Sequence, residues 1–147
     1  MVNTATPKSL EFTLPNDFGA QQIVHERICA QIMQCGPTRR EEFCIRLALE
    51  EALTNAMKHG NKMHPDKKVF VKSTIEDSTV TIEIEDEGNG FVVEQLPDPT
   101  NEENLGRPSG RGVLLIRSFM DHVDYNEKGN LVVMSKELGS TSTELSD

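Results

Sequence analysis

Residues 79–90, with the sequence TVTIEIEDEGNG, decide what kind of fold this chain forms. Every second residue from Val80 to Ile84 is apolar, and a period of two is typical of a strand with one buried face. The same alternation places Asp86 on the buried face, where a carboxylate is costly unless other groups donate hydrogen bonds to it. Gly88 and Gly90 then allow a sharp turn and a close approach of the backbone to a ligand. The pattern indicates the floor of a pocket, and a solvated Asp-Gly turn is the other interpretation.

The composition limits the classes of protein to which the chain can belong. It has 147 residues, 36% of them hydrophobic and 27% charged, which fits one globular domain with a single core. The net charge of −9 argues against a nucleic-acid backbone or an anionic membrane as the main partner. No export leader is recognised and no apolar run reaches the roughly 18 residues of a membrane span, so we expect a cytoplasmic protein. Because Cys29, Cys35 and Cys44 match no metal-binding spacing, we expect reduced, mostly buried thiols.

Apolar periodicity and turn signals divide the chain into short elements. Pro15 ends the first expected strand, and Thr38 caps the second expected helix. Because neighbouring strands are mostly joined by hairpins, we expect an α+β fold: a two-layer α/β sandwich with a mixed, mostly antiparallel sheet and helices on one face. The folded domain is expected at 10–137, between a flexible N-terminus at 1–9 and a flexible C-terminal tail at 138–147. The expected elements are a strand at 10–14, helices at 18–34 and 38–59, strands at 68–76 and 79–86, a helix at 112–120, and strands at 122–126 and 130–136.

A second feature is a polar stripe on a helix that is otherwise apolar almost all round, at 48–59. Glu51 and Asn55 lie four residues apart and therefore share one face, which Lys58 extends. The stripe either forms an internal network or faces a polar cleft. In the second case it combines a carboxylate base with an amide oxygen that can bind Mg²⁺ one turn later. Glu50 lies about 100° further round the helix, so we take it for a surface or ion-pairing residue.

A third feature is the segment Ser-Gly-Arg-Gly at 109–112, which leads into an apolar helix. Glycines before a helix expose its first N–H groups, and these groups with the helix dipole form a site suited to phosphate. Arg111 adds positive charge between Gly110 and Gly112. A flexible entry loop with a glycine cap is the alternative. The segment is not a Walker loop, because no G-x-x-x-x-G-K-[ST] motif occurs in the chain.

Together the three segments resemble the nucleotide-binding motifs of the GHKL ATPase/kinase superfamily, and most closely those of the anti-sigma-factor serine-protein kinases. Residues 51–60 are similar to the N box of this family, including its His-Gly ending. Residues 86–91 are similar to the G1 box, and residues 107–121 to the G2 box with its following helix. The resemblance covers about residues 10–137 and implies the Bergerat, or histidine-kinase-like, ATPase fold.

The resemblance also implies roles for individual residues around ATP and Mg²⁺. Asp86 would bind the adenine amino group, and Gly88 and Gly90 would shape the adenine end of the site. Asn55 would hold Mg²⁺ between the phosphates. Glu51 would be the general base that takes a proton from the attacking hydroxyl.

The phosphate end of the site would come from the third segment. Gly110 and Gly112 would release an ATP lid at 92–109 and present N–H groups to phosphate. Arg111 and Lys58 would be charge partners there. One departure concerns the last strand, where the family often has Gly-Thr and this chain has Gly-Asn at 129–130.

The resemblance implies an ATP- and Mg²⁺-dependent serine/threonine protein kinase. Such a kinase phosphorylates a small antagonist (anti-anti-sigma) protein and sequesters a sigma-like factor, which regulates transcription without direct contact to nucleic acid or membrane. One alternative is a non-catalytic, nucleotide-dependent protein-binding module of the same fold. Another is a detached histidine-kinase catalytic domain, for which His25 is the nearest phosphate acceptor; a core or surface histidine is the simpler interpretation. The apolar residues of the first helix and of the strand at 10–14 could serve a homodimer.

Overall fold

The structure is a computed structural model that describes residues 8–88 and 110–139, without the side chains of 110–114. The expected ATP lid at 92–109, including its loop, lies outside these residues, as does Gly90. The two ends that we expected to be flexible also lie mostly outside them. None of the helices in the described ranges is long and apolar enough to cross a bilayer.

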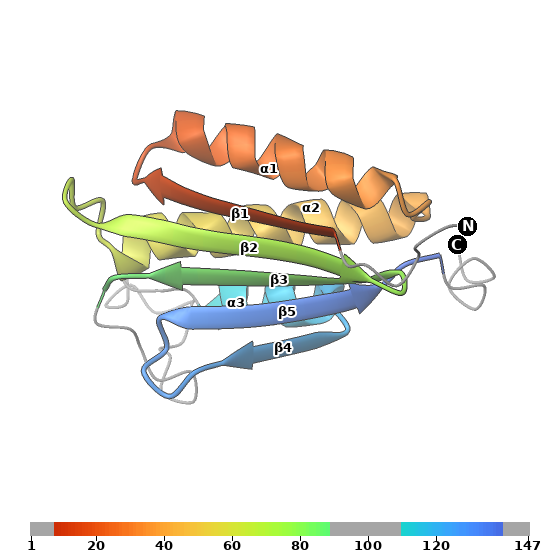
Figure 1. Ribbon diagram of the computed structural model, residues 1–147. Coiled ribbons are helices and arrows are strands. Elements are labelled where there is room, and N and C mark those ends of the chain that lie inside the picture. The colour runs from red at the N-terminus through yellow and green to blue at the C-terminus, as the bar shows by residue number, and fades with distance from the viewer. Residues whose placement is uncertain (1–7, 89–109, 140–147) are drawn as a thin grey trace.

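The described residues form a five-stranded sheet and a layer of helices (Figure 1). The strand order is β1-β2-β3-β5-β4, and each neighbouring pair is antiparallel. The predicted α+β class is confirmed, although no parallel pair occurs among the described strands. The elements are β1 (Lys8–Pro15), α1 (Phe18–Met33), α2 (Arg39–Thr54), the π-helical turn η1 (Asn55–Gly60), β2 (Lys68–Glu76), β3 (Thr79–Asp86), α3 (Gly110–Phe119), β4 (His122–Tyr125) and β5 (Leu131–Glu137).

The core lies between the sheet and the helices. The alternation predicted for β3 is confirmed, because Ile82 and Ile84 are almost fully buried while the residues between them are more exposed. Their antiparallel neighbours on β2 are Ser73 and Val71. Burying one large aliphatic side chain of this kind contributes about 1.5–3 kcal/mol. The helices supply the opposite wall of the core, chiefly through Ile28, Ile32, Ile45, Leu49, Leu53, Met57 and Ile116.

The three thiols follow the sequence-based expectation. Cys29 and Cys44 are buried, Cys35 is half-buried, and all three are free. Burial raises the pKa of the Cys29 thiol, which keeps it protonated and unreactive at neutral pH.

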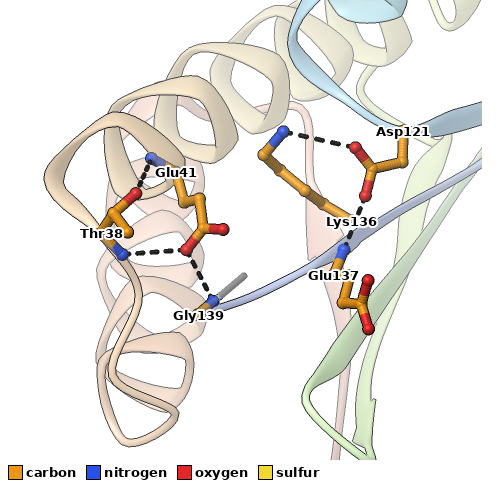
Figure 2. Close-up of polar contacts among 6 residues, drawn as sticks. All are labelled: Thr38, Glu41, Asp121, Lys136, Glu137 and Gly139. Carbon is orange, nitrogen blue, oxygen red and sulfur yellow. Dashed lines mark hydrogen bonds and ion pairs between the residues drawn. The ribbon is translucent and has the colours of Figure 1, made fainter. Parts of the chain in front are cut away.

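The helix α2 begins after Thr38, the predicted cap, and the structure adds a reciprocal capping box with Glu41. The Thr38 hydroxyl accepts the Glu41 N–H at 3.1 Å, and the Glu41 carboxylate accepts the Thr38 N–H at 2.9 Å. The same Glu41 oxygen accepts the N–H of Gly139 at 2.8 Å, so the N-terminus of α2 is joined to the chain just after β5 (Figure 2). Asp121, which follows α3, accepts the N–H of Glu137 at 2.8 Å (Figure 2). The start of α2 and the end of α3 therefore meet at the end of β5, and the two helices run antiparallel.

Candidate nucleotide-binding site

The site is built around Asp86, the last residue of β3. As the alternation predicted, its side chain lies on the buried face, and the residue is 7% exposed. The Gly88 N–H donates to Asp86 Oδ1 at 2.8 Å. Burial raises the pKa of the Asp86 carboxyl to about 6, and the hydrogen bond from Gly88 opposes this shift. Asp86 is therefore a buried acid with capacity for a further hydrogen-bond donor.

Two glycines allow the end of η1 to lie directly against this acid. A Cβ atom on Gly60 would overlap the Asp86 carboxyl group, and a Cβ atom on Gly88 would overlap the carbonyl oxygen of Gly60. Sequence reasoning treated Gly60 only as the end of a helix. It missed that the π-helical turn, a feature frequent at functional sites, brings Gly60 onto Asp86.

Asn61 joins η1 to both neighbouring strands, and sequence reasoning did not identify it. The residue is 1% exposed, and its amide oxygen accepts the Glu87 N–H at 2.7 Å. Its amide nitrogen donates to the Lys68 carbonyl at 2.9 Å and to Asn16 Oδ1 at 3.0 Å. A buried amide must satisfy its donors and acceptor, so these bonds position the start of β2 and the end of β3 together. Its only signal in the sequence is its place after the Gly that ends the helix.

The turn between β4 and β5 holds Asp86 from the other side. The Asp86 N–H donates to the Asn130 carbonyl at 2.9 Å, and Asn130 Nδ2 donates to the Asp86 carbonyl at 2.9 Å. Asn130 Oδ1 accepts from Asn126 Nδ2 at 2.8 Å. Both ends of the Asn130 amide are thus engaged within the protein. At the position where the resemblance led us to expect Thr, this residue positions the backbone of the pocket acid.

A pocket opens between this hairpin and the helices, and it brings Asp86 and Asn55 together as predicted. Its walls come from both layers and combine apolar side chains with a few polar ones. The lining residues are Ala52, Asn55, Ala56, Ile84, Asp86, Tyr125, Gly129, Asn130, Leu131 and Val132.

Glu51 lies one turn before Asn55 and is half-buried, outside the pocket lining. Burial raises the pKa of Tyr125 to about 12; the positive charge of Arg117 lowers it and the negative charge of Glu51 raises it. Glu51 therefore lies near the place where α2, α3 and β4 meet. Glu50 is exposed, which confirms that it faces outward.

The other predicted site residues lie at the edge of the described region. Lys58 is exposed and does not line the pocket. The helix α3 begins at Gly110, two residues earlier than predicted, so Gly110 and Gly112 lie within its first turn rather than before it. The first N–H groups of a helix have no intrahelical partner, so this turn still exposes donors. Arg111 belongs to the same turn, and Gly90 lies outside the described residues.

Comparisons with known proteins agree with this geometry. The family model described as "Histidine kinase-like ATPase domain" matches residues 19–136. The anti-sigma F factor of Oceanobacillus iheyensis is 34% identical over 122 residues, which are 79% of this chain and 83% of that protein. The anti-sigma F factor of Bacillus subtilis is 33% identical over 120 residues, which are 78% of this chain and 82% of that protein.

A solved structure resembles the fold. The crystal structure of the RsbU and RsbW domains of Rv1364c from Mycobacterium tuberculosis matches with a TM-score of 0.60 and 15% identity. The match covers 89% of this chain and 32% of that chain, and at this identity it supports the fold alone. The match to the family model over most of the chain, together with the relatives above 30% identity, identifies the family: this chain belongs to the histidine kinase-like ATPases of the GHKL type, together with the anti-sigma F factors.

Proposed function

We propose that this chain is an ATP- and Mg²⁺-dependent serine/threonine protein kinase of the anti-sigma type, acting in the cytoplasm. It would phosphorylate a small antagonist protein and, in another state, sequester a sigma-like factor. The observation that carries the proposal is the pocket that Asp86 and Asn55 share, one helical turn from Glu51. The names of the relatives from Oceanobacillus iheyensis and Bacillus subtilis, both anti-sigma F factors, support it.

At the adenine end, the proposed role of Asp86 is to accept a hydrogen bond from the amino group of the base. The apolar walls formed by Ala52, Ile84 and Val132 would lie against the ring. The Gly88 N–H already holds one carboxylate oxygen, so the acid is oriented before the nucleotide enters.

At the phosphate end, the donor set fits a hard cation. Two amide side chains line the pocket, and Asn130 is engaged at both ends. Within residues 8–88 and 110–139, no hydrogen bond engages the Asn55 amide, so Asn55 is the one free to bind a metal. Mg²⁺ takes oxygen ligands and completes its shell with water and phosphate, and it would neutralise phosphate charge there. The first turn of α3, with Arg111, and Lys58 would supply further positive potential.

In the proposed reaction, Glu51 takes the proton of the acceptor hydroxyl. The hydroxyl oxygen bonds to the γ-phosphorus, the bond from that phosphorus to the bridging oxygen breaks, and ADP leaves. A half-buried carboxylate on a rigid helix suits this role because its position is set before the acceptor arrives.

The test is a transfer assay with radiolabelled Mg-ATP and the small antagonist proteins of the source organism, each purified and tried separately. We expect acid-stable phosphoserine or phosphothreonine on one of them. A label that acid removes would indicate a histidine kinase, and no label on any of them would indicate a binding module.

The base is tested by Glu51→Gln, which should retain Mg-ATP binding and lose transfer. Glu50→Gln is the matched control, because Glu50 is the neighbouring carboxylate and faces outward. Wild-type transfer by Glu51→Gln would exclude Glu51 as the base.

A further inference from the structure

An exposed apolar surface lies on the two helices that flank the proposed catalytic base. Phe43 on α2 is 59% exposed, and Leu47 is 36% exposed. On α3, Leu115 is 40% exposed, and Phe119 is half-buried. We call these four residues the α2–α3 face. Large exposed apolar groups that cluster in this way mark interaction sites more often than chance exposure does.

The two aromatic side chains of the face are in contact across the helices. The rings of Phe43 and Phe119 meet edge-on, with centroids 6.4 Å apart and planes at 75°. Glu41 at the start of α2 and Asp121 after the end of α3 both bind the chain at the end of β5 (Figure 2). The start of one helix therefore lies beside the end of the other, and the two helices run antiparallel. Leu47 lies one turn after Phe43, and Leu115 lies one turn before Phe119. Because the helices are antiparallel, Leu47 and Leu115 therefore lie at the same level along the pair.

The α2–α3 face leads to Glu51. Phe43, Leu47 and Glu51 follow one another at intervals of four residues, so they lie along one side of α2. Eight residues of helix correspond to about 12 Å, so Phe43 and Glu51 are close enough for one partner to reach both. A protein seated on Phe43 and Leu47 can therefore present a hydroxyl to Glu51.

Charges of both signs surround the face, with Glu42 and Glu50 as well as arginines on its rim. Arg39 and Arg46 of α2 and Arg117 of α3 are all exposed. Arg46 forms a long, partly exposed ion pair with Glu42, at 3.9 Å. Aromatic residues and arginine are the residue types enriched at the energetic centres of interfaces. The complementary partner surface is apolar at its centre, with acidic groups opposite the arginines.

We propose that the α2–α3 face is the docking surface for the protein that accepts the phosphoryl group. The proposal rests on the kinase function proposed above. The partner would place an apolar side chain between Phe43 and Leu47, acidic groups near Arg39 and Arg117, and its serine or threonine hydroxyl at Glu51.

The kinetic test compares the wild type with the double variant Phe43→Ser/Leu47→Ser in the transfer assay. Both residues are exposed, so the fold should tolerate the change. We expect the KM for the accepting protein to rise about tenfold or more, with kcat and Mg-ATP affinity nearly unchanged. Ile23→Ser is the matched control, because Ile23 is 61% exposed on α1 and should leave KM unchanged.

An unchanged KM in the double variant would overturn the docking surface while leaving the kinase function intact. Transfer to no protein by the wild type would instead refute the kinase function. Loss of Mg-ATP binding by the double variant would show that the face supports the nucleotide site and would also count against docking.

A second test identifies the occupant directly. A photoreactive benzoylphenylalanine at position 43, with position 23 as the control, is cross-linked in the source organism. The proposal expects the protein captured at position 43 to accept phosphate from the wild type in the purified assay. Capture of a second copy of this chain, of a sigma-like factor, or of nothing at position 43 would overturn it.

Discussion

The main chains of Asp86 and Asn130 are joined by a hydrogen bond, and the side chain of Asn130 adds another. The Asp86 N–H donates to the Asn130 carbonyl at 2.9 Å, and Asn130 Nδ2 returns a bond of 2.9 Å to the Asp86 carbonyl. The β4–β5 hairpin therefore holds the pocket acid at the end of β3. Both residues line the pocket, and the bonds between them fix the backbone of the acid that we propose to bind adenine.

Asn130→Ala should weaken both the hairpin and nucleotide binding. Removing the amide leaves the Asp86 carbonyl without its side-chain donor, which costs about 1–3 kcal/mol in a partly buried site. Urea unfolding and calorimetric titration of Mg-ATP measure the two effects. Asn130→Thr, which restores the residue that the family often has, is the comparison. Equal affinity in the wild type and in Asn130→Ala would show that the bond does not position the acid.

Asp86→Asn should abolish most of the Mg-ATP affinity. The asparagine amide cannot offer adenine the ionised acceptor that a carboxylate provides. A charged hydrogen bond contributes about 1.5–3 kcal/mol, or roughly tenfold to a hundredfold in affinity. The control is Glu85→Gln, which removes the exposed carboxylate next to it. Calorimetric titration with Mg-ATP and Mg-ADP measures the change. Tight binding by Asp86→Asn would place the nucleotide elsewhere.

Mg-ATP binding should weaken as the pH falls through about 6. The pKa of Asp86 is raised to about 6, so its carboxylate, the proposed acceptor for adenine, becomes protonated in this range. The free energy of unfolding of the nucleotide-free protein should instead rise as the pH falls through this range. A carboxyl whose pKa is raised on folding stabilises the folded state when protonated, so its contribution is lost as the pH rises from about 4 to about 6. Titrations and unfolding curves across this range test both statements. The same profile in Asp86→Asn would assign the effect to another group.

Gly88→Ala should destabilise the protein and disrupt the pocket. Its added Cβ would overlap the carbonyl oxygen of Gly60, which is backbone and cannot rotate away, so we expect a cost of about 1–3 kcal/mol or more. Gly19→Ala is the matched control, because its Cβ would meet nothing closer than 3.4 Å and alanine favours the helix. Urea unfolding measures both. A neutral Gly88→Ala would mean that η1 can move away from Asp86.

Local signals in the sequence were sufficient to predict most elements and the buried position of Asp86. The period of two placed β3 at the observed residues and put Asp86 on the buried face. Thr38 marked the start of α2, and spacing on that helix put Glu51 and Asn55 one turn apart. These features follow from the geometry of a single strand or helix, which residues within a few positions of one another control.

Contacts between distant segments came only from the tertiary structure. The bond between Asn61 and Glu87 joins residues 26 apart, and the bond between Asn130 and Asp86 joins residues 44 apart. Neither follows from periodicity, because each depends on the order and register of the strands. The approach of Gly60 to Asp86 and the alignment of Phe43 with Phe119 have the same origin. The sequence by itself determined the elements and the buried face on which Asp86 lies, because these depend on neighbouring residues, and packing between the layers decided which distant residues meet.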